Sequence, residues 1–161
     1  DNLASIYLDN KKYVKGGFVN KKVLSAYVKE CIKEFEIACD SEQSPVRMLS
    51  GGNIQKVIVA REFTSGANLI IANQPTRGID VGTASLIHRL LHKYTREKKF
   101  AVLLISSDLN EILNLSDRLL VMRDGSIGAQ FVEMDKVTDE MLGEYMLGIK
   151  KMTPEERGEL Y

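Results

Sequence analysis

Two apolar segments on either side of an amphipathic helix constrain the fold of this chain more than any other feature. The segments 68–73 (NLIIAN) and 100–106 (FAVLLIS) are short runs of apolar, β-type residues, a pattern typical of parallel strands that are covered on both faces. Residues 83–98 between them have the period of a helix, with an apolar face formed by Ala84, Ile87, Leu90, Leu91 and Tyr94. The order strand, helix, strand predicts a βαβ unit and an α/β fold with a parallel sheet.

The first third of the chain is predicted to be helical. Residues 20–38 carry an apolar stripe at helical spacing, and Asn20 is a suitable N-cap because its side-chain oxygen can accept from a free first-turn amide. A polar loop leads to a second helix over 53–64, which Gly66 is expected to terminate in the left-handed conformation.

After the βαβ unit the pattern predicts a short helix, a hairpin and a last helix. Residues 109–115 form the short helix, and a strand over 117–122 turns through RDGS into a second strand over 127–132. Thr138 caps the last helix, which ends near Gly148. Residues 150–161 are expected to form a loose polar tail.

Composition excludes some classes of function. The 161 residues contain 22 Lys plus Arg and 22 Asp plus Glu, so the net charge is zero and offers no general attraction for nucleic acid. No apolar run approaches the ~20 residues that a membrane-spanning helix requires. Cys31 and Cys39 have no further cysteine to pair with, which favours reduced, packed thiols in a soluble, cytosolic chain over a disulfide or metal site.

Two glycines follow a serine at the start of the second predicted helix, in the segment LSGGNIQK. The first amides of a helix have no intrahelical partner and carry partial positive charge, and glycines allow a phosphate to approach them. The segment is not a Walker A loop, because no glycine of the chain is followed by lysine. Two interpretations stay open: Ser50 is an ordinary N-cap, or Ser50, Gly51 and Gly52 form a phosphate-contacting helix start.

The first predicted strand ends in two amides where a nucleotide hydrolase would have two acids. The segment LIIANQPTRGID runs from apolar residues into Asn73 and Gln74, then through a tight Arg-Gly turn to Asp80. An amide neither supplies charge to a metal nor accepts a proton at neutral pH. Loss of a general base alone typically lowers a rate by a factor of about 10²–10⁴.

In combination these segments resemble the ATPase domains of ABC transporters. LSGGNIQKVIVARE resembles their signature motif, LIIANQPTRGID their Walker B strand and D-loop, LLISSD their switch strand, and SDRLLVMRDGSI the hairpin that follows. More narrowly, GGNIQK, QPTRGIDVG and SSDLNEILNLSDR resemble the C-terminal half of bacterial subunits that import simple sugars and nucleosides and carry two ATPase halves in one polypeptide.

The resemblance covers residues 2–150 and begins beyond Walker A. It implies a partial P-loop NTPase core with a parallel sheet and a helical signature subdomain. The expected division is a helical signature subdomain at 1–66, the C-terminal part of the α/β ATPase core at 67–150 and a polar tail at 151–161.

The resemblance implies a site that has lost its own catalytic groups. Asn73 and Gln74 stand at the positions of the Walker B acids, and Ser107 stands at that of the switch histidine. We therefore expect no active catalytic group in this chain. The parts that serve a partner's nucleotide are intact, and they are Ser50, Gly51, Gly52, Gln55 and Asp80. These residues are expected to contact ATP that is held, with Mg²⁺, mainly by the N-terminal half.

The resemblance also implies partners and a location. A half of this type works beside an N-terminal ATPase half and against membrane permease subunits, on the inner face of the cell membrane, and it couples ATP hydrolysis to solute uptake. QPTRG and SSDLNEIL tilt the cargo toward nucleosides. Alone, the chain is expected to be inactive, and the open edge of a partial sheet favours self-association. Two alternatives stay open: a non-transport ABC protein, and an interaction module with no nucleotide role.

Three weaker patterns have ordinary structural interpretations. His88 and His92 have a spacing that can hold zinc, but they lack a third ligand and fall on the polar face of their helix. The basic segment 11–15 (KKYVK) is expected to be a solvated loop. An apolar stripe in the last helix is expected to pack in the core, and it consists of Met141, Leu142, Tyr145 and Met146.

Overall fold

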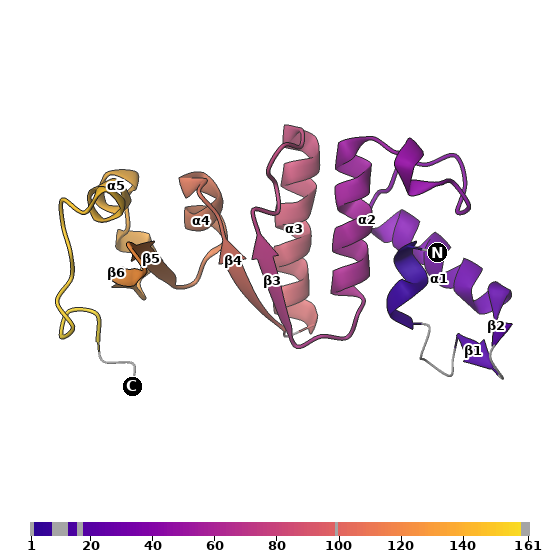
Figure 1. Cartoon of the computed structure of the whole chain (residues 1–161), viewed down its shortest axis with the longest axis horizontal. Coiled ribbons are helices and arrows are strands. Elements are labelled where there is room, and N and C mark those ends of the chain that lie inside the picture. Colours follow the sequence, from indigo (N-terminus) through magenta and orange to yellow (C-terminus); the bar gives the residue numbers. More distant parts are fainter. Residues whose placement is uncertain (1, 8–12, 16–17, 99, 159–161) are drawn as a thin grey trace. The chain divides into compact units, whose positions relative to one another are not determined.

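The computed structural model describes residues 2–7, 13–15, 18–98 and 100–158 (Figure 1). The chain forms two compact units, residues 1–103 and 104–161. The first contains the short helices η1 (Asn2–Tyr7) and η2 (Val46–Met48), the strands β1 (Val14–Lys15), β2 (Phe18–Val19) and β3 (Leu69–Asn73), and the helices α1 (Lys21–Glu34), α2 (Gly51–Phe63) and α3 (Val81–Lys98). Strand β4 (Ala101–Ile105) crosses the division. The second unit continues with α4 (Leu109–Leu115), β5 (Leu119–Arg123), β6 (Ser126–Phe131), η3 (Met134–Lys136) and α5 (Asp139–Leu147).

Helix α1 begins at the predicted cap and ends earlier than predicted. The side chain of Asn20 accepts from the backbone N–H of Val23 at 3.3 Å, which satisfies a first-turn donor. The helix ends at Glu34, and Phe35 is its C-cap. The predicted end at residue 38 is wrong because the backbone leaves the helical conformation at Glu36, whose φ is +51°.

Helix α2 begins two residues before the predicted start. Ser50 is its N-cap, and the Ser50 side chain accepts from the backbone N–H of Asn53. Gly51 and Gly52 therefore form the first turn of the helix instead of preceding it. The helix ends with Thr64 as C-cap, and Gly66 follows in the left-handed conformation, with a φ of +80°. Gly66 thus has the predicted left-handed conformation, but it lies two residues after the C-cap.

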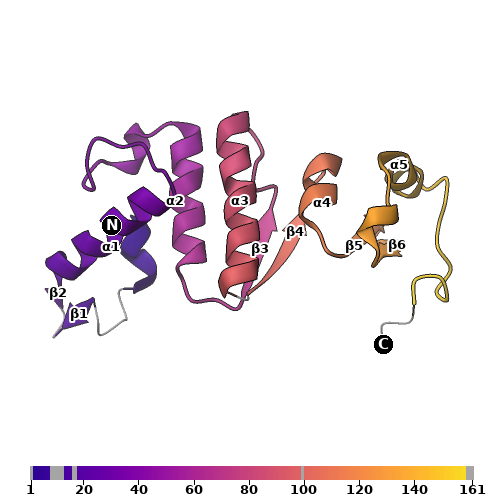
Figure 2. The same cartoon turned by 180° about the vertical axis from the view of Figure 1, so that it is seen from behind.

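Aromatic rings join the three long helices of the first unit. The ring of Phe63 lies 5.0 Å from that of Tyr94 and 5.7 Å from that of Phe100, and the ring of Phe35 lies 5.9 Å from that of Tyr94, between centroids. Phe35 has no exposed surface. Figure 2 shows α2 and α3 side by side. The face predicted to be apolar on α3 is confirmed as buried at Ile87, Leu90, Leu91 and Tyr94, with Ala84 half-buried.

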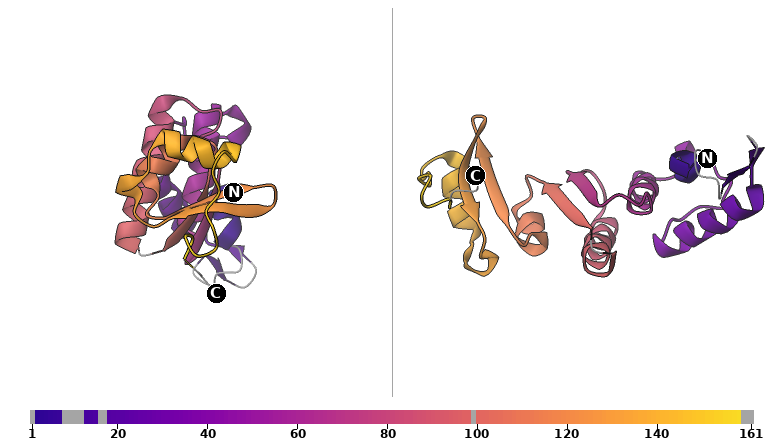
Figure 3. Two further views of the ribbon diagram at one scale, coloured as in Figure 1. Left: turned by 90° about the vertical axis from the view of Figure 1, so that its left-hand side faces the viewer. Right: turned by 90° about the horizontal axis from the view of Figure 1, so that it is seen from below.

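Strands β3 and β4 pair in parallel and α3 connects them, so the predicted βαβ unit is confirmed. The prediction that both faces of this sheet are buried is wrong. Leu69 and Ile71 are 53% and 64% exposed, and Leu103 is 50% exposed, whereas Ile70 is buried. Successive side chains of a strand point to opposite faces. In the described part of the first unit, helix α3 covers one face of the two strands and no element covers the other (Figure 3).

The second unit is a hairpin packed against one helix. Strands β5 and β6 are antiparallel, with Arg123 opposite Ser126. Asp124 and Gly125 have φ values of +49° and +73°, the left-handed backbone that a two-residue hairpin turn requires. Figure 3 shows α5 along this hairpin. The buried core of the unit consists of Val121, Ala129, Phe131 and Leu142.

Helices α4 and α5 have the predicted limits. Helix α4 spans the predicted residues, and at α5 the Thr138 side chain accepts from the N–H of Met141, while Gly148 ends the helix with a φ of +71°. Of the predicted stripe, Leu142 is buried and both Met141 and Tyr145 pack against the core. The prediction is wrong for Met146, which is 45% exposed.

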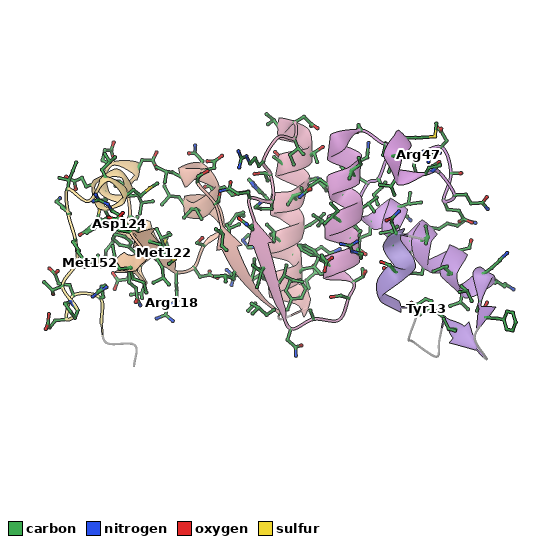
Figure 4. All side chains as sticks on the ribbon, in the orientation of Figure 1. Tyr13, Arg47, Arg118, Met122, Asp124 and Met152 are labelled. Carbon is green, nitrogen blue, oxygen red and sulfur yellow. The ribbon has the colours of Figure 1, made fainter. Side chains whose placement is uncertain are left out.

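The prediction of a loose tail is wrong for residues 150–158. The backbone N–H of Met152 donates to the carbonyl of Gly128 at 3.0 Å, and the Met152 sulfur accepts from the N–H of Gln130 at 3.4 Å. Arg157 donates to a further carbonyl of β6. Figure 4 shows Met152 beside the hairpin. Met152 and Arg157 thus dock a segment whose composition is mostly polar. Residues 159–161 of the predicted tail lie outside the described residues.

The remaining sequence expectations concern single side chains. Cys31 and Cys39 are free thiols in the described structure, buried and half-buried respectively. Burial raises the pKa of the Cys31 thiol above its ordinary value. His92 is exposed and His88 is half-buried. In the basic segment Lys11 and Lys12 lie outside the described residues. The solvated-loop expectation is wrong for the rest, because Tyr13 is buried and Val14 and Lys15 form strand β1, which pairs with β2. No helix in the described ranges is long and apolar enough to cross a membrane.

Candidate functional site

The start of α2 presents an exposed hydroxyl and open backbone. Ser50 is exposed and its Oγ accepts from the Asn53 backbone N–H at 3.4 Å and from Asn53 Nδ2 at 2.9 Å. Gly51 is also exposed, and a Cβ built on it would meet no heavy atom within 4 Å. The N-cap interpretation of Ser50 is therefore confirmed. The cap leaves an exposed serine and an open glycine at the positive end of a 13-residue helix.

Gly52 has a different environment from that of Gly51. A Cβ built on Gly52 would lie 2.9 Å from Thr83 Oγ1 and 3.2 Å from Asp80 Oδ2. No real side chain would fit there without displacing Thr83 or Asp80. The absence of a side chain at Gly52 thus permits the start of α2 to pack directly on the start of α3.

Asp80 caps α3. Its Oδ1 accepts from the backbone N–H of Thr83 at 2.9 Å and its Oδ2 accepts from the Thr83 hydroxyl at 2.8 Å. The Asp80 carbonyl accepts from the N–H of Ala84 at 2.9 Å, so the helix begins at this residue as a capped turn. The hydrogen bonds from Thr83, first from its backbone and then from its hydroxyl, lower the pKa of the exposed Asp80 carboxyl below its ordinary value.

Gln55 joins the second turn of α2 to the loop that follows β3. Its Nε2 donates to the backbone carbonyl of Pro75 at 2.9 Å, and Pro75 is buried. The side-chain amide is thereby engaged within the chain. A direct contact of Gln55 with nucleotide stays a prediction.

Asn73 and Gln74 end β3 in a tight turn. Asn73 is exposed, Gln74 is half-buried, and the φ of Gln74 is +51°, which is uncommon for a residue with a side chain. The Gln74 carbonyl accepts from the N–H of Arg77 at 3.2 Å, and Gly78 follows with a φ of +75°. The turn predicted from Arg-Gly is thus present. Ser107 is exposed and belongs to the second unit, so its place in the same site stays a prediction.

The structure brings four of the five predicted nucleotide-contacting residues into one locality, the α2 start with Asp80, and ties Gln55 to the same loop. Sequence reasoning missed Thr83 and Pro75, which hold this arrangement. The spacing Asp80-Val81-Gly82-Thr83 is a helix-capping pattern and would have indicated Thr83.

The donors at the α2 start fit an anion. Free amides, a hydroxyl and an open glycine suit phosphate oxygens. A divalent metal is a different case, because it prefers several carboxylate or other oxygen ligands. Among the described residues, no group of three His, Cys, Asp or Glu could hold a metal ion. Of the two implied groups, this chain's residues therefore fit ATP phosphates and leave Mg²⁺ without a carboxylate pair.

Known proteins similar to this chain are ATP-binding subunits of importers. No protein-family model matches it. The nucleoside import ATP-binding protein NupA of Lactococcus lactis is 42% identical over 134 residues, which are 83% of this chain and 26% of that protein. The guanosine import ATP-binding protein NupO of Bacillus subtilis is 40% identical over 91% of this chain and 28% of its own length. The ribose import ATP-binding protein RbsA of Oceanobacillus iheyensis is 38% identical over 82% and 26%.

Solved structures agree with these relatives. An ATP-binding cassette dimer, solved in a post-hydrolysis state bound to ADP and Pi, aligns with a TM-score of 0.66 at 25% identity and covers 81% of this chain. The chain covers 55% of that cassette and about a quarter of the curated relatives it matches. The α/β topology, the glycine-started helix α2 and these relatives give one conclusion. The chain belongs to the family of ABC-transporter ATPases.

Proposed function

We propose that this chain is the signature-bearing part of an ATP-binding subunit of a nucleoside or sugar importer. It contributes donors to ATP that another cassette half holds, and it carries no working catalytic base of its own. The observation that carries the proposal is the start of α2, where an exposed Ser50 hydroxyl and the open Gly51 backbone lie at a helix N-terminus.

The chemistry follows from the residues present. The Ser50 hydroxyl and the amides of Gly51 and Gly52 donate hydrogen bonds to the terminal phosphate, at the position where charge increases during hydrolysis. Preorganised donors of this kind lower the barrier because they need no reorganisation during the reaction. The partner half supplies the phosphate-binding loop and the oxygens for Mg²⁺. ATP with Mg²⁺ supplies the hydrolysis chemistry when it is bound there.

The end of β3 supports the assignment of the hydrolytic chemistry to the partner. Asn73 and Gln74 provide neutral amides in place of acids, and Ser107 provides a short hydroxyl in place of an imidazole. None of these groups accepts a proton at neutral pH. The isolated chain is therefore inactive as an ATPase.

The names of similar proteins support the cargo and the membrane partner. Proteins named for nucleoside and guanosine import are 42% and 40% identical to this chain, and one named for ribose import is 38% identical. These identities differ by only a few percentage points, so we place nucleosides before sugars on the segments QPTRG and SSDLNEIL. The proposed partners are an N-terminal ATPase half and permease subunits at the inner face of the membrane. The proposed division of labour is that residues 1–66 transmit closure to the permease, residues 67–150 complete the ATPase core and residues 151–161 form an appended segment.

Two further proposals concern self-association of the chain and an alternative function. In the described structure β3 and β4 form a two-stranded sheet. Open strand edges favour pairing with a second copy. A non-transport ABC protein is the second candidate, and it would keep the same nucleotide chemistry with a different partner. A permease encoded beside the gene would favour the importer.

The test separates the capping role of Ser50 from its proposed phosphate contact. The host is the guanosine import ATP-binding protein of Bacillus subtilis, with its aligned segment replaced by this chain. Ser50→Ala is expected to lower ATP turnover by about 10²-fold, the usual effect of losing one such donor. Ser50→Asp keeps a good N-cap but places a negative charge near phosphate, so it is expected to retain stability and lose turnover.

The controls define what would contradict the proposal. Thermal unfolding of each variant shows whether the cap is intact, and Ser50→Asp is expected to melt close to the parent. An Asp variant with parental turnover would show that Ser50 serves only as a cap. Parental turnover in both variants would favour an interaction module with no nucleotide role.

A further inference from the structure

We infer that Thr83 is a positioning residue: it holds the Asp80 carboxylate against the backbone of Gly52, so that the signature glycines and the loop 73–80 keep one fixed spacing. This inference rests on the proposed function, because the spacing matters to a nucleotide only if the α2 start contacts it.

Thr83 fixes both carboxylate oxygens of Asp80 from a buried position. The side chain is 7% exposed, in a loop–helix junction where Asp80 itself is exposed. The backbone N–H reaches Oδ1 at 2.9 Å and the hydroxyl reaches Oδ2 at 2.8 Å. A carboxylate held at both oxygens has one orientation, whereas a cap made by the backbone alone would leave Oδ2 free to rotate away.

The Thr83 hydroxyl also lies against the first turn of α2, at Gly52. The position of a Cβ on Gly52 lies 2.9 Å from Thr83 Oγ1, closer than real Cβ contacts, and 3.2 Å from Asp80 Oδ2. The two neighbouring glycines thus have separate roles. Gly51 has open space where a side chain would stand, and Gly52 allows the backbone to approach the Thr83–Asp80 pair.

A hydrogen bond from Gln55 also joins α2 to the loop 73–80. Gln55, one turn further along α2, donates to Pro75, near the loop's start, while the Gly52 backbone passes close to Asp80 at the loop's end. The loop is therefore hydrogen-bonded to α2 at one point and lies close against it at a second. Displacements of about 1 Å at a positioning contact can lower turnover by as much as 10²-fold, so a fixed spacing of this kind has a catalytic consequence.

The first test measures the arrangement in the purified 161-residue chain, without nucleotide. Carbon-13 and nitrogen-15 NMR follows the Asp80 carboxyl and the Gly52 amide as the pH is lowered. In the parent chain both signals are expected to change with one midpoint. Thr83→Val removes the hydroxyl at nearly constant volume, so the Asp80 midpoint should move up and the Gly52 amide should no longer follow it. Thr83→Ser should restore the parental Asp80 midpoint and the response of the Gly52 amide. Thr95→Val removes a helix hydroxyl that donates to the backbone carbonyl of His92, and it should change neither signal.

A double-variant cycle tests the contact with Gly52. Gly52→Ala is expected to lower the midpoint of chemical unfolding because its Cβ collides with Thr83. Thr83→Ala removes the nearest atom of that collision, so the double variant should lose less than the sum of the single losses. Additive losses, or a Gly52 amide that ignores the Asp80 titration, would overturn the inference.

The last test asks whether the spacing serves turnover. In the importer chimera, Thr83→Val is expected to lower kcat by roughly tenfold with the KM for ATP unchanged, and Thr83→Ser to restore it. Parental kcat in Thr83→Val would overturn the positioning role. If the unmodified chimera hydrolyses no ATP, the proposed function fails, and the NMR titration still decides whether Thr83 orients Asp80 against Gly52.

Discussion

The first unit has a cluster of four aromatic rings in its core, whereas the second has a single ring pair, and the α2 start with Asp80 belongs to the first. In the first unit, rings from α1, α2 and α3 meet around Phe63 and Tyr94. In the second, aliphatic residues and Phe131 lie between a hairpin and α5. Aromatic side chains bury large, rigid areas and are well suited to fixing helices against one another. The rings of Phe63 and Tyr94 hold the far ends of α2 and α3 together, whereas the starts of these helices, where the candidate site lies, meet at Gly52 and Thr83.

Phe35→Ala is expected to cause the largest loss of stability, and this loss should be confined to the first unit. Phe35 has no exposed surface and contacts the rings of Phe63 and Tyr94. The substitution is expected to lower the free energy of unfolding of this unit by about 3–5 kcal/mol, because it removes buried surface and leaves a cavity. Hydrogen exchange read by mass spectrometry should show faster exchange in α1, α2 and α3, with α5 and the hairpin unchanged. Equal acceleration in both units would show that they share one cooperative core.

Leu142→Ala is the matched change in the second unit. Leu142 is 1% exposed and packs against the β5–β6 hairpin. The expected loss is about 2–5 kcal/mol, confined to residues 104–158. The Asp80 titration in the first unit should keep its midpoint. A shift of that midpoint would contradict the assignment of the site to the aromatic unit.

The smallest expected effect is on how the stability of the first unit depends on pH, through Asp80. Hydrogen bonds from Thr83 lower the pKa of Asp80 in the folded chain, so the folded state binds this proton less readily than the unfolded state, whose pKa is about 3.9. The stabilisation is complete above the unfolded pKa and is lost as the pH falls through the folded pKa. Asp80→Asn keeps a capping oxygen without titrating.

The measurement compares the unfolding of Asp80→Asn with that of the parent chain at two pH values. Unfolding midpoints at pH 6 and at pH 3 should differ less in the first unit of the variant than in that of the parent. The second unit, where Glu140 also has a lowered pKa because of backbone and Thr138 hydrogen bonds, should respond to acid equally in both proteins. An unchanged pH dependence of the first unit would show that Asp80 is not oriented as described.

Local signals made much of this fold predictable. Asn20 and Thr138 begin their helices and Gly148 ends one, as expected, and the turn at Asp124-Gly125 also forms as expected, because caps and tight turns depend on the few residues that form them. The family could also be inferred from combined motifs. Features that depend on distant packing were not predictable in the same way.

The failures have a common physical cause. The apolar run that ends at Asn73 predicts cover on both faces, but a run of residues does not specify which element supplies it, and Ile71 is 64% exposed. The docking of Met152 on β6 depends on contacts with Gly128 and Gln130, which composition does not reveal. The local spacing from Asp80 could have indicated Thr83 as part of a helix cap, but its closeness to Gly52, 31 residues earlier in the chain (83 − 52), could not be inferred from a local pattern.

The central claim is that this chain contributes donors to a nucleotide held by another half. Calorimetric titration of Mg-ATP into the purified chain tests it most directly. We expect no binding tighter than roughly 0.1 mM, about −5.5 kcal/mol, because the chain has the α2 start but no Walker A loop. Binding tighter than that value, with Ser50→Ala as tight as the parent, would mean that the chain holds a nucleotide site of its own and would contradict the claim.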